Sequence, residues 1–188
     1  MGKQFTALSN KHIEFIAEQK IYFVATAAPT GRVNLSPKGG DSLRVIDSNT
    51  IAWLNLTGSG NESAAHVLQD TRMTIMFCAF EGSPIILRTY GQARMIHQTD
   101  AEWDKYCDLF PKSHATRQIF ILDVDMVQSS CGMSVPYFDF QQGRDDLNRW
   151  FDKRDKNDIE AYWRKKNQKS IDGFDTEILE RSGVPVED

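Results

Sequence analysis

The sequence contains little cysteine, no long apolar run and no strong excess of either charge. Its three cysteines, Cys78, Cys107 and Cys131, are odd in number and far apart, so we expect reduced thiols in a cytoplasmic protein. The longest apolar stretches, such as residues 73–80, have the length of a strand, and the first ten residues lack the apolar core of a signal peptide. The 26 acidic residues outnumber the 22 basic ones, which excludes a global positive field. We therefore expect neither a membrane nor a nucleic acid as a partner.

The motifs of several common site classes are also missing. The four histidines are isolated from one another and from the cysteines, so we expect no metal site. No G-x-S-x-G elbow and no P-loop pattern occurs, and no doubly wound α/β pattern is present to hold a hydrolase nucleophile. Triads assemble in space, so spacing alone leaves Ser-His-Asp hydrolysis open. We assign no catalytic residue from the sequence.

Short β-rich runs separated by turn signals make up most of the chain. With 188 residues, 40% of them hydrophobic, it is long enough for one domain with a helical appendage. Helices are expected after a cap at Ser9, over residues 61–69, and from a cap at Thr99 towards Cys107. The close spacing of the strands predicts antiparallel meanders in a sandwich or small barrel. We predict at least seven strands, over residues 21–26, 32–36, 43–46, 50–56, 72–80, 84–96 and 117–127.

The C-terminal part differs in kind, and we divide the chain into a barrel at residues 1–140 and an appendage at 141–188. Between residues 144 and 166 charged residues dominate, yet apolar residues recur at steps of three and four. This pattern predicts an amphipathic helix, broken near Asn157, that docks on the protein's own core or on a second subunit. Residues 177–188 are expected to form a loosely held tail. The apolar stripe consists of Leu147, Trp150, Phe151, Ile159, Tyr162 and Trp163.

The loop at residues 56–63, LTGSGNES, lies between a predicted strand and a predicted helix. Glycine-spaced residues before a helix offer free backbone N–H groups and the positive end of the helix dipole to an anion, most often a phosphate. The same residues also fit an ordinary solvated turn in which Asn61 caps the next helix. The loop alone leaves both interpretations open.

Polar residues on neighbouring strands are suited to a phosphorylated, aromatic cofactor. Asn34 and Ser36 share one face of a strand, and Lys38 can follow them to it. Trp53 shares a face with Asn55 one strand later. Arg88 interrupts an apolar strand, where an unpaired charge is costly, so it requires an anion. Its alternatives are a salt bridge to Glu62 or Asp70 and a snorkelling side chain on an edge strand.

Five ordered motifs resemble the pyridoxamine 5′-phosphate oxidase-like, FMN-binding split-barrel proteins, in particular an uncharacterised branch with GSGNE and SIDG motifs. The resemblance covers most of the chain. It implies a mainly β (α+β) fold, a six-stranded antiparallel split barrel with flanking helices, and a homodimer that holds two FMN molecules in the subunit interface. The motifs are RVNLSPKG (32–39), AWLNLTGSGNESAAHVLQDTRMTIMF (52–77), PIILRTYGQARM (84–95), VQSSCGMSVP (127–136) and KNQKSIDGF (166–174).

Carried over by position, the resemblance implies a set of FMN-binding residues. A first strand touches the phosphate and the ring edge, a second strand lines the flavin, and the loop with nearby cations holds the phosphate. Two residues of the partner subunit pack on the isoalloxazine, although Cys131 also fits a small residue in a turn. In that order the residues are Val33, Asn34, Leu35, Ser36 and Lys38; Trp53 and Leu54; Ser59, Gly60, Asn61, Glu62 and Arg88; and Ser130 and Cys131.

Two departures from the oxidases bear on function. Asn61 and Glu62 stand where the oxidases have an Arg-Lys pair, and residues 133–136, Met-Ser-Val-Pro, stand where they have the Arg-x-His that grips pyridoxal phosphate. We expect an FMN-dependent oxidoreductase with a different small-molecule substrate and a donor such as NAD(P)H. The alternative is a non-catalytic FMN- or haem-binding or stress-sensing module, for which His66 and His97 are the candidate haem ligands.

Overall fold

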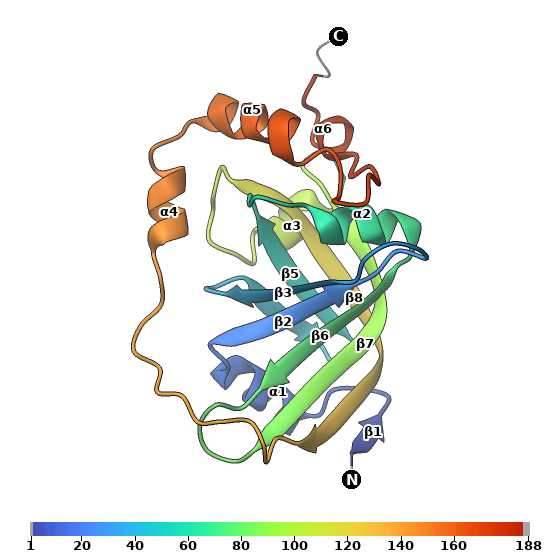
Figure 1. The fold of residues 1–188 in the computed structure, drawn as a ribbon, viewed down its shortest axis with the longest axis vertical. Helices are drawn as coiled ribbons and strands as arrows, with labels where there is room; N and C mark the ends of the chain where they lie inside the picture. Colours follow the sequence, from blue (N-terminus) through green and yellow to red (C-terminus); the bar gives the residue numbers. More distant parts are fainter. Residues whose placement is uncertain (1, 186–188) are drawn as a thin grey trace.

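The computed structural model describes residues 2–185, which form one antiparallel sheet of eight strands surrounded by helices (Figure 1). The strands follow the order β3-β2-β6-β7-β8-β5-β4, and β1 pairs with β8 outside this path. Their bounds are Lys3–Phe5 (β1), Ile21–Thr26 (β2), Asn34–Gly39 (β3), Leu43–Asp47 (β4), Thr50–Leu56 (β5), Arg72–Cys78 (β6), Ile85–Ile96 (β7) and Thr116–Cys131 (β8).

The sheet curls into a barrel that remains open between its two ends, β3 and β4. These strands follow each other in the chain, yet no ladder joins them within the described residues. Where the chain crosses between them, the Ser42 carbonyl accepts a hydrogen bond of 2.8 Å from the Leu54 N–H. The prediction of a mainly β split barrel is confirmed, although with eight strands rather than six. The sequence missed β1, because its three residues are all exposed and carry no alternating pattern.

The N-terminal helices follow the predicted positions more closely than the predicted caps. Helix α1 (Asn10–Glu18) starts with the expected cap, in which the Ser9 side chain accepts from the His12 N–H. Helix α2 (Glu62–Gln69) is also present, but the Asn61 side chain does not cap it. Helix α3 (Trp103–Cys107) begins later than predicted, and the Thr99 hydroxyl donates to the Arg181 carbonyl instead of capping it.

Alternation along the strands fills the barrel with apolar side chains. Trp53 of β5 and Phe120 of β8 stack with ring centroids 4.6 Å apart, and Val24, Ile75 and Leu87 are buried in the same cluster. Burial of each such side chain contributes about 1.5–3 kcal/mol relative to exposure. The barrel wall beside the open edge is therefore a rigid surface on which polar side chains can be held in place.

Three helices follow β8: α4 (Asp146–Phe151) stands beside the barrel, and α5 (Lys156–Lys166) and α6 (Ile178–Arg181) lie over one end of it (Figure 1). The break between α4 and α5 lies at residues 152–155 rather than near Asn157, because Asp155 caps α5 by accepting from the Asp158 N–H.

The prediction of a loose tail is wrong for residues 177–185. Ile178, Leu179 and Val184 are buried in a cluster with Ile159 and Trp163, and this cluster also includes Ala115 of the barrel end. Residues 186–188 of the expected tail lie outside the described residues. The last helices are thus packed on the barrel by the same apolar stripe that the sequence shows at helical spacing.

A substitution at Gly91 tests the packing of the two longest strands. Gly91 of β7 lies at a register shift opposite Val124, and a Cβ atom there would stand 2.0 Å from the Asp123 carbonyl oxygen. Because the obstacle is backbone, we expect Gly91→Ala to lower the free energy of unfolding by about 3 kcal/mol in urea titrations. Gly143→Ala is the control, since nothing lies within 4 Å of its added Cβ. Equal stability of the two variants would contradict this register.

Candidate functional site

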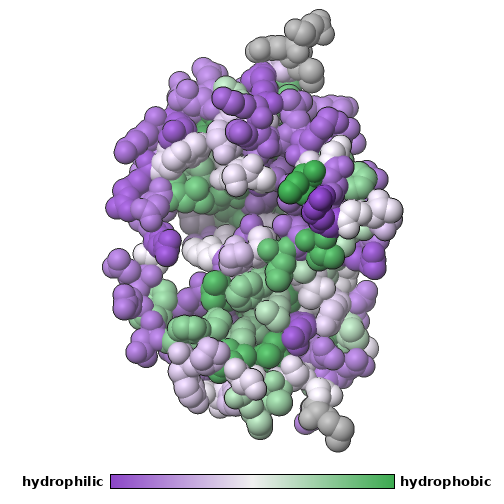
Figure 2. Space-filling view, in the orientation of Figure 1, coloured by the Kyte–Doolittle hydropathy of each residue, from purple (hydrophilic) through white to green (hydrophobic). Residues whose placement is uncertain are grey.

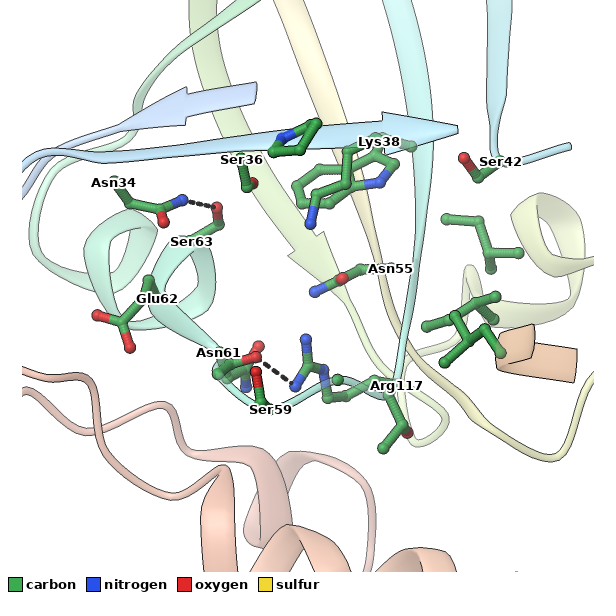
Figure 3. A pocket seen from close by; sticks show the side chains of 18 of the residues that line it. Asn34, Ser36, Lys38, Ser42, Asn55, Ser59, Asn61, Glu62, Ser63 and Arg117 are labelled. Carbon is green, nitrogen blue, oxygen red and sulfur yellow. Dashed lines mark hydrogen bonds between the residues drawn. The ribbon is translucent and has the colours of Figure 1, made fainter. Parts of the chain in front are cut away.

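A cavity of about 510 Å³ lies where the barrel is open, between β3 and β5 and at the N-terminus of α2 (Figure 3). Its volume is in the range of pockets that hold small molecules and cofactors. The loop at residues 57–61 closes one end, and Leu147 of α4 reaches its rim. The polar side chains that line it are those of Asn34, Ser36, Lys38, Ser42, Asn55, Thr57, Ser59, Asn61, Glu62, Ser63 and Arg117.

Strand β3 contributes to this cavity with every second side chain. Asn34, Ser36 and Lys38 are half-buried and line it, and the Asn34 amide donates to the Ser63 hydroxyl of α2 at 3.3 Å. Leu35, which lies between the first two, alternates to the other side and is 64% exposed, and Val33 directly before the strand is 73% exposed. The structure thus places three of the five predicted β3 residues in the cavity of this chain.

Lys38 stands over an aromatic surface inside the cavity. Its Nζ lies 5.1 Å from the centre of the Trp53 ring, and Trp53 in turn stacks on Phe120. Burial, together with the positive charge of Arg117, lowers the pKa of Lys38 to about 8. The ammonium group is therefore held in an environment that favours a bound negative charge.

Arg117 of β8 is a second and more deeply buried cation at the same cavity. Its side chain is 3% exposed, and its Nη1 donates to the Gly60 carbonyl at 2.8 Å. Burial lowers the pKa of Arg117 to about 9. Among residues 2–185, neither Arg117 nor Lys38 forms an ion pair with a carboxylate, and the Arg117 Nε has no hydrogen-bond partner. A half-buried and a fully buried positive charge without a counter-ion are costly unless an anion joins them.

In the loop before α2, three backbone carbonyl groups accept hydrogen bonds within the protein, whereas the backbone N–H groups remain unpaired among the described residues. The Gly58 carbonyl accepts from Asn167, the Gly60 carbonyl from Arg117, and the Asn61 carbonyl from the first turn of α2. In contrast, no hydrogen bond between described residues uses a backbone N–H of residues 58–61 as donor. Free N–H groups beside a helix N-terminus form a binding surface for an anion.

The Asn61 side chain adds one more donor. Its Oδ1 accepts a hydrogen bond of 2.7 Å from the Gln118 amide, and its Nδ2 is buried without a partner among the described residues. The expectation that this side chain caps α2 is therefore wrong, because the buried amide of Gln118 competes for it. Asn61 itself is one of the residues that line the cavity.

Glu62 does not neutralise the two cations. Its carboxylate accepts from the Ile171 N–H at 3.1 and 3.2 Å, and Figure 3 shows its side chain directed away from Arg117. This contact turns the one acidic side chain among the lining residues towards the C-terminal segment. The positive character of the cavity is preserved by that arrangement.

Besides Val33 and Leu35, three further predicted residues lie elsewhere in this chain. Arg88 of β7 donates to the Ser130 hydroxyl of β8 at 3.3 Å, Cys131 is exposed at the end of β8, and none of the three lines the cavity. The alternative salt bridges of Arg88 do not form, because Glu62 contacts Ile171 and Asp70 pairs with Arg72.

Among the residues that sequence reasoning did not assign to the site, Arg117 is the most important. The sequence offered the same kind of evidence for Arg117 as for Arg88, because each is a charged residue at a predominantly apolar strand. Ser42, Gln118 and Thr57 were also missed, and no pattern in the sequence marks them.

Histidines and acidic residues do not assemble into a metal site in the described part of the chain. His66 is buried and contacts the Thr26 hydroxyl, and His97 is buried beside Ser182, with burial lowering its pKa to about 3. Neither histidine lines the cavity. Within residues 2–185, no helix has the length and apolar character needed to cross a membrane.

A family model and a curated relative both match this chain, and they name the same family. Residues 8–131 match the family described as pyridoxamine 5′-phosphate oxidase. The chain is 33% identical over 140 residues to the pyridoxamine 5′-phosphate oxidase family protein ustO of Aspergillus flavus, an alignment that covers 72% of this chain and 56% of the relative. The chain thus spans little more than half the length of that curated relative.

Solved structures show the same fold at low identity. HupZ of Group A Streptococcus matches with a TM-score of 0.51 and 19% identity, over 63% of this chain and 91% of that chain. A candidate pyridoxamine 5′-phosphate oxidase of Lactobacillus delbrueckii matches with a TM-score of 0.53 and 17% identity, over 65% of this chain and 94% of that chain. These likenesses establish the fold alone.

The lowered pKa of Lys38 predicts how stability depends on pH. Unfolded lysine keeps its proton to about pH 10.5, whereas folded Lys38 loses it near pH 8, so the unfolded state binds more protons in this window. The Lys38 contribution therefore makes the ligand-free protein more stable as the pH rises, by at most about 1.4 kcal/mol per pH unit. Urea unfolding of the parent and of Lys38→Met, compared between about pH 8 and 10, isolates this contribution.

The exposed Lys153 supplies the control for that comparison. Lys153→Met should follow the parent at each pH, whereas Lys38→Met should lack the rise. A Lys38→Met profile parallel to that of the parent would show that Lys38 is not in a desolvated environment.

Proposed function

Because the chain belongs to the pyridoxamine 5′-phosphate oxidase family, we propose that it is a flavoprotein whose cavity binds FMN and which acts as an oxidoreductase. The observation that carries this proposal is the pair of buried cations, Lys38 and Arg117, without a carboxylate partner in the described chain. A terminal phosphate supplies the negative charge that this pair lacks.

The residues present fit the phosphate end of FMN. Arg117 has an unpartnered Nε, Asn61 has an unpartnered Nδ2, and the loop offers free backbone N–H groups. Charge-assisted hydrogen bonds from such donors are the strongest that a phosphate forms with protein. Lys38 of β3 and Arg117 of β8 would supply the positive charge that the Arg-Lys pair supplies in the oxidases. Asn61 and Glu62 can therefore stand at the positions of that pair.

The other side of the cavity fits an aromatic ring. Trp53 and Leu54 supply apolar surface on β5, and Ser36 and Asn55 offer polar groups at its edge. When bound, FMN supplies reversible hydride and electron transfer, while the protein contributes binding, orientation and exclusion of water. We assign no side chain as acid or base, and a donor such as NAD(P)H is part of the proposal.

We also propose that the substrate is not pyridoxamine 5′-phosphate. The residues in the place of the oxidases' Arg-x-His are Met133, Ser134 and Val135, and Met133 is 81% exposed. They provide at most one hydroxyl, so a second phosphate bound there would lose hydration without a charged partner. The alternative function is an FMN-binding module without turnover, which shares the same cavity. Reduction of the bound flavin by NAD(P)H in the absence of oxygen distinguishes the two.

A second copy of this chain is the proposed partner. Leu35 of β3 and Val33, which directly precedes this strand, are exposed, and β3 is the last strand of the sheet on that side. Residues 132–145 form a wide arc beside the barrel, and their exposed side chains include Tyr137, Phe138 and Phe140 (Figure 1). Figure 2 shows apolar residues gathered on this face and an opening between the arc and the body. Exposed apolar surface of this extent is typical of a subunit interface.

Flavin titrations test the proposed function. We expect the parent protein to bind FMN, and Arg117→Met to reduce FMN affinity about 100-fold, since a buried charge pair loses one partner. Riboflavin has the same ring without the phosphate, so its affinity should change far less. Fluorescence quenching of each flavin measures both dissociation constants.

Arg94→Met is the matched control, because Arg94 is an exposed cation of β7 that pairs with Glu102 outside the cavity. It should bind FMN like the parent. Failure of the parent protein to bind either flavin would refute the proposed cofactor. Unchanged FMN affinity in Arg117→Met would refute the phosphate assignment alone.

Light scattering tests the dimer. We expect a mass of twice 21.4 kDa for the parent, and a single-chain mass after Val33→Lys and Leu35→Lys are combined, because two charges on the same edge strand oppose its burial. Ile46→Lys is the control, since Ile46 is exposed on β4 at the opposite edge and should leave the dimer intact. A parent protein that is monomeric with flavin bound would contradict the proposed partner.

A further inference from the structure

The motif at residues 166–174 does not line the cavity. Its segment of the chain nevertheless contacts the loop at residues 57–61, which closes one end of the cavity. We call residues 163–172 the C-terminal clamp. Within it the Trp163 Nε1 donates to the Thr57 hydroxyl at 2.8 Å, and the Asn167 Nδ2 donates to the Gly58 carbonyl at 3.0 Å. The Ile171 N–H donates to the Glu62 carboxylate. The clamp thus contacts the side chains at both ends of the loop, Thr57 at its start and Glu62 directly after it, and between them Asn167 contacts the loop backbone at Gly58.

Asn167 is the member of the clamp that acts on the loop backbone. It is completely buried, and its own carbonyl accepts from the Thr176 hydroxyl at 2.6 Å. Its Oδ1 has no partner among the described residues. An apolar residue here would remove the unpaired Oδ1 but would leave the Gly58 carbonyl without its donor, so the contact with the loop explains the amide.

The orientation of one peptide group supplies the explanation. In a peptide the C=O and the following N–H point in opposite directions, because the group is planar and trans. When Asn167 holds the Gly58 carbonyl on the clamp side, the N–H of Ser59 is directed to the opposite side, where the cavity lies. Arg117 holds the Gly60 carbonyl, so the following N–H, that of Asn61, is fixed in the direction away from Arg117.

We infer that Asn167 is a positioning residue for anion recognition, which keeps the Gly58 carbonyl away from the cavity and the following N–H available to a phosphate. The ligand class is a phosphate monoester, and this inference rests on the proposed function for its identification as FMN. A released peptide would turn a carbonyl oxygen towards the phosphate, and like partial charges repel. The effect of Asn167 is therefore specific to the phosphate and not to the flavin ring.

The test compares FMN with riboflavin in two variants. Asn167→Ala removes the amide, and Asn167→Asp keeps its volume but replaces the donor with an acceptor. We expect each variant to bind FMN at least about tenfold more weakly than the parent and to bind riboflavin within about twofold of it. The ratio of the two dissociation constants is the readout, because general destabilisation of the fold changes both flavins together.

Thr176→Val is the matched control. It removes a buried hydrogen bond to the backbone of the same Asn167 but leaves the amide and Gly58 in place. We expect it to lower the melting temperature and to preserve the ratio of FMN to riboflavin affinity. A ratio that is unchanged in both Asn167 variants, or that changes equally in Thr176→Val, would overturn the inference.

Inorganic phosphate separates this inference from the proposed cofactor. If the parent binds neither flavin, FMN is the wrong ligand, and the rise in melting temperature with phosphate then decides the role of Asn167. A rise in the parent and in Thr176→Val that is lost in both Asn167 variants supports the inference. A rise that survives in those variants, or that is absent from the parent, overturns it.

Discussion

The burial of two positive charges beside one another, without a carboxylate to neutralise them, is the constraint on which the site depends. Lys38 and Arg117 come from strands on different sides of the barrel opening, and each has its pKa lowered by burial. Such an arrangement persists only where the surrounding structure holds it. The stacked pair of Trp53 and Phe120 supplies a rigid floor, and the contact of Glu62 with Ile171 withdraws the nearest acid.

The split in the barrel provides the place where this constraint can be met. A closed sheet would satisfy the edges of β3 and β4 and leave no space between them, whereas the open edge admits polar side chains beside a packed interior. Alternation then sends Asn34 and Ser36 into the cavity and Leu35 to the outside. One strand therefore serves two surfaces, the cavity and the face proposed for the partner.

Local pattern was enough to predict seven of the eight strands and the β3 side chains that line the cavity, because both follow from a period of two. Local pattern was not enough to decide which of two arginines, Arg88 or Arg117, lines the cavity. Both stand in apolar strands, and only the pairing of β8 with β5, with its irregularity at Asn55, brings Arg117 to the loop. The loose-tail prediction failed for a related reason: Ile178 and Leu179 are too sparse to show periodicity, and their burial depends on the distant Ile159.

The clamp makes the loop at residues 57–61 depend on a part of the chain that is synthesised more than a hundred positions later, since Gly58 and Asn167 are separated by 109 residues. During translation the barrel strands emerge and can pair before this contact exists. The loop reaches its final hydrogen bonding once α5 has left the ribosome and docked. Under the proposed function, a phosphorylated ligand meets the complete loop only after the C-terminal helices have docked.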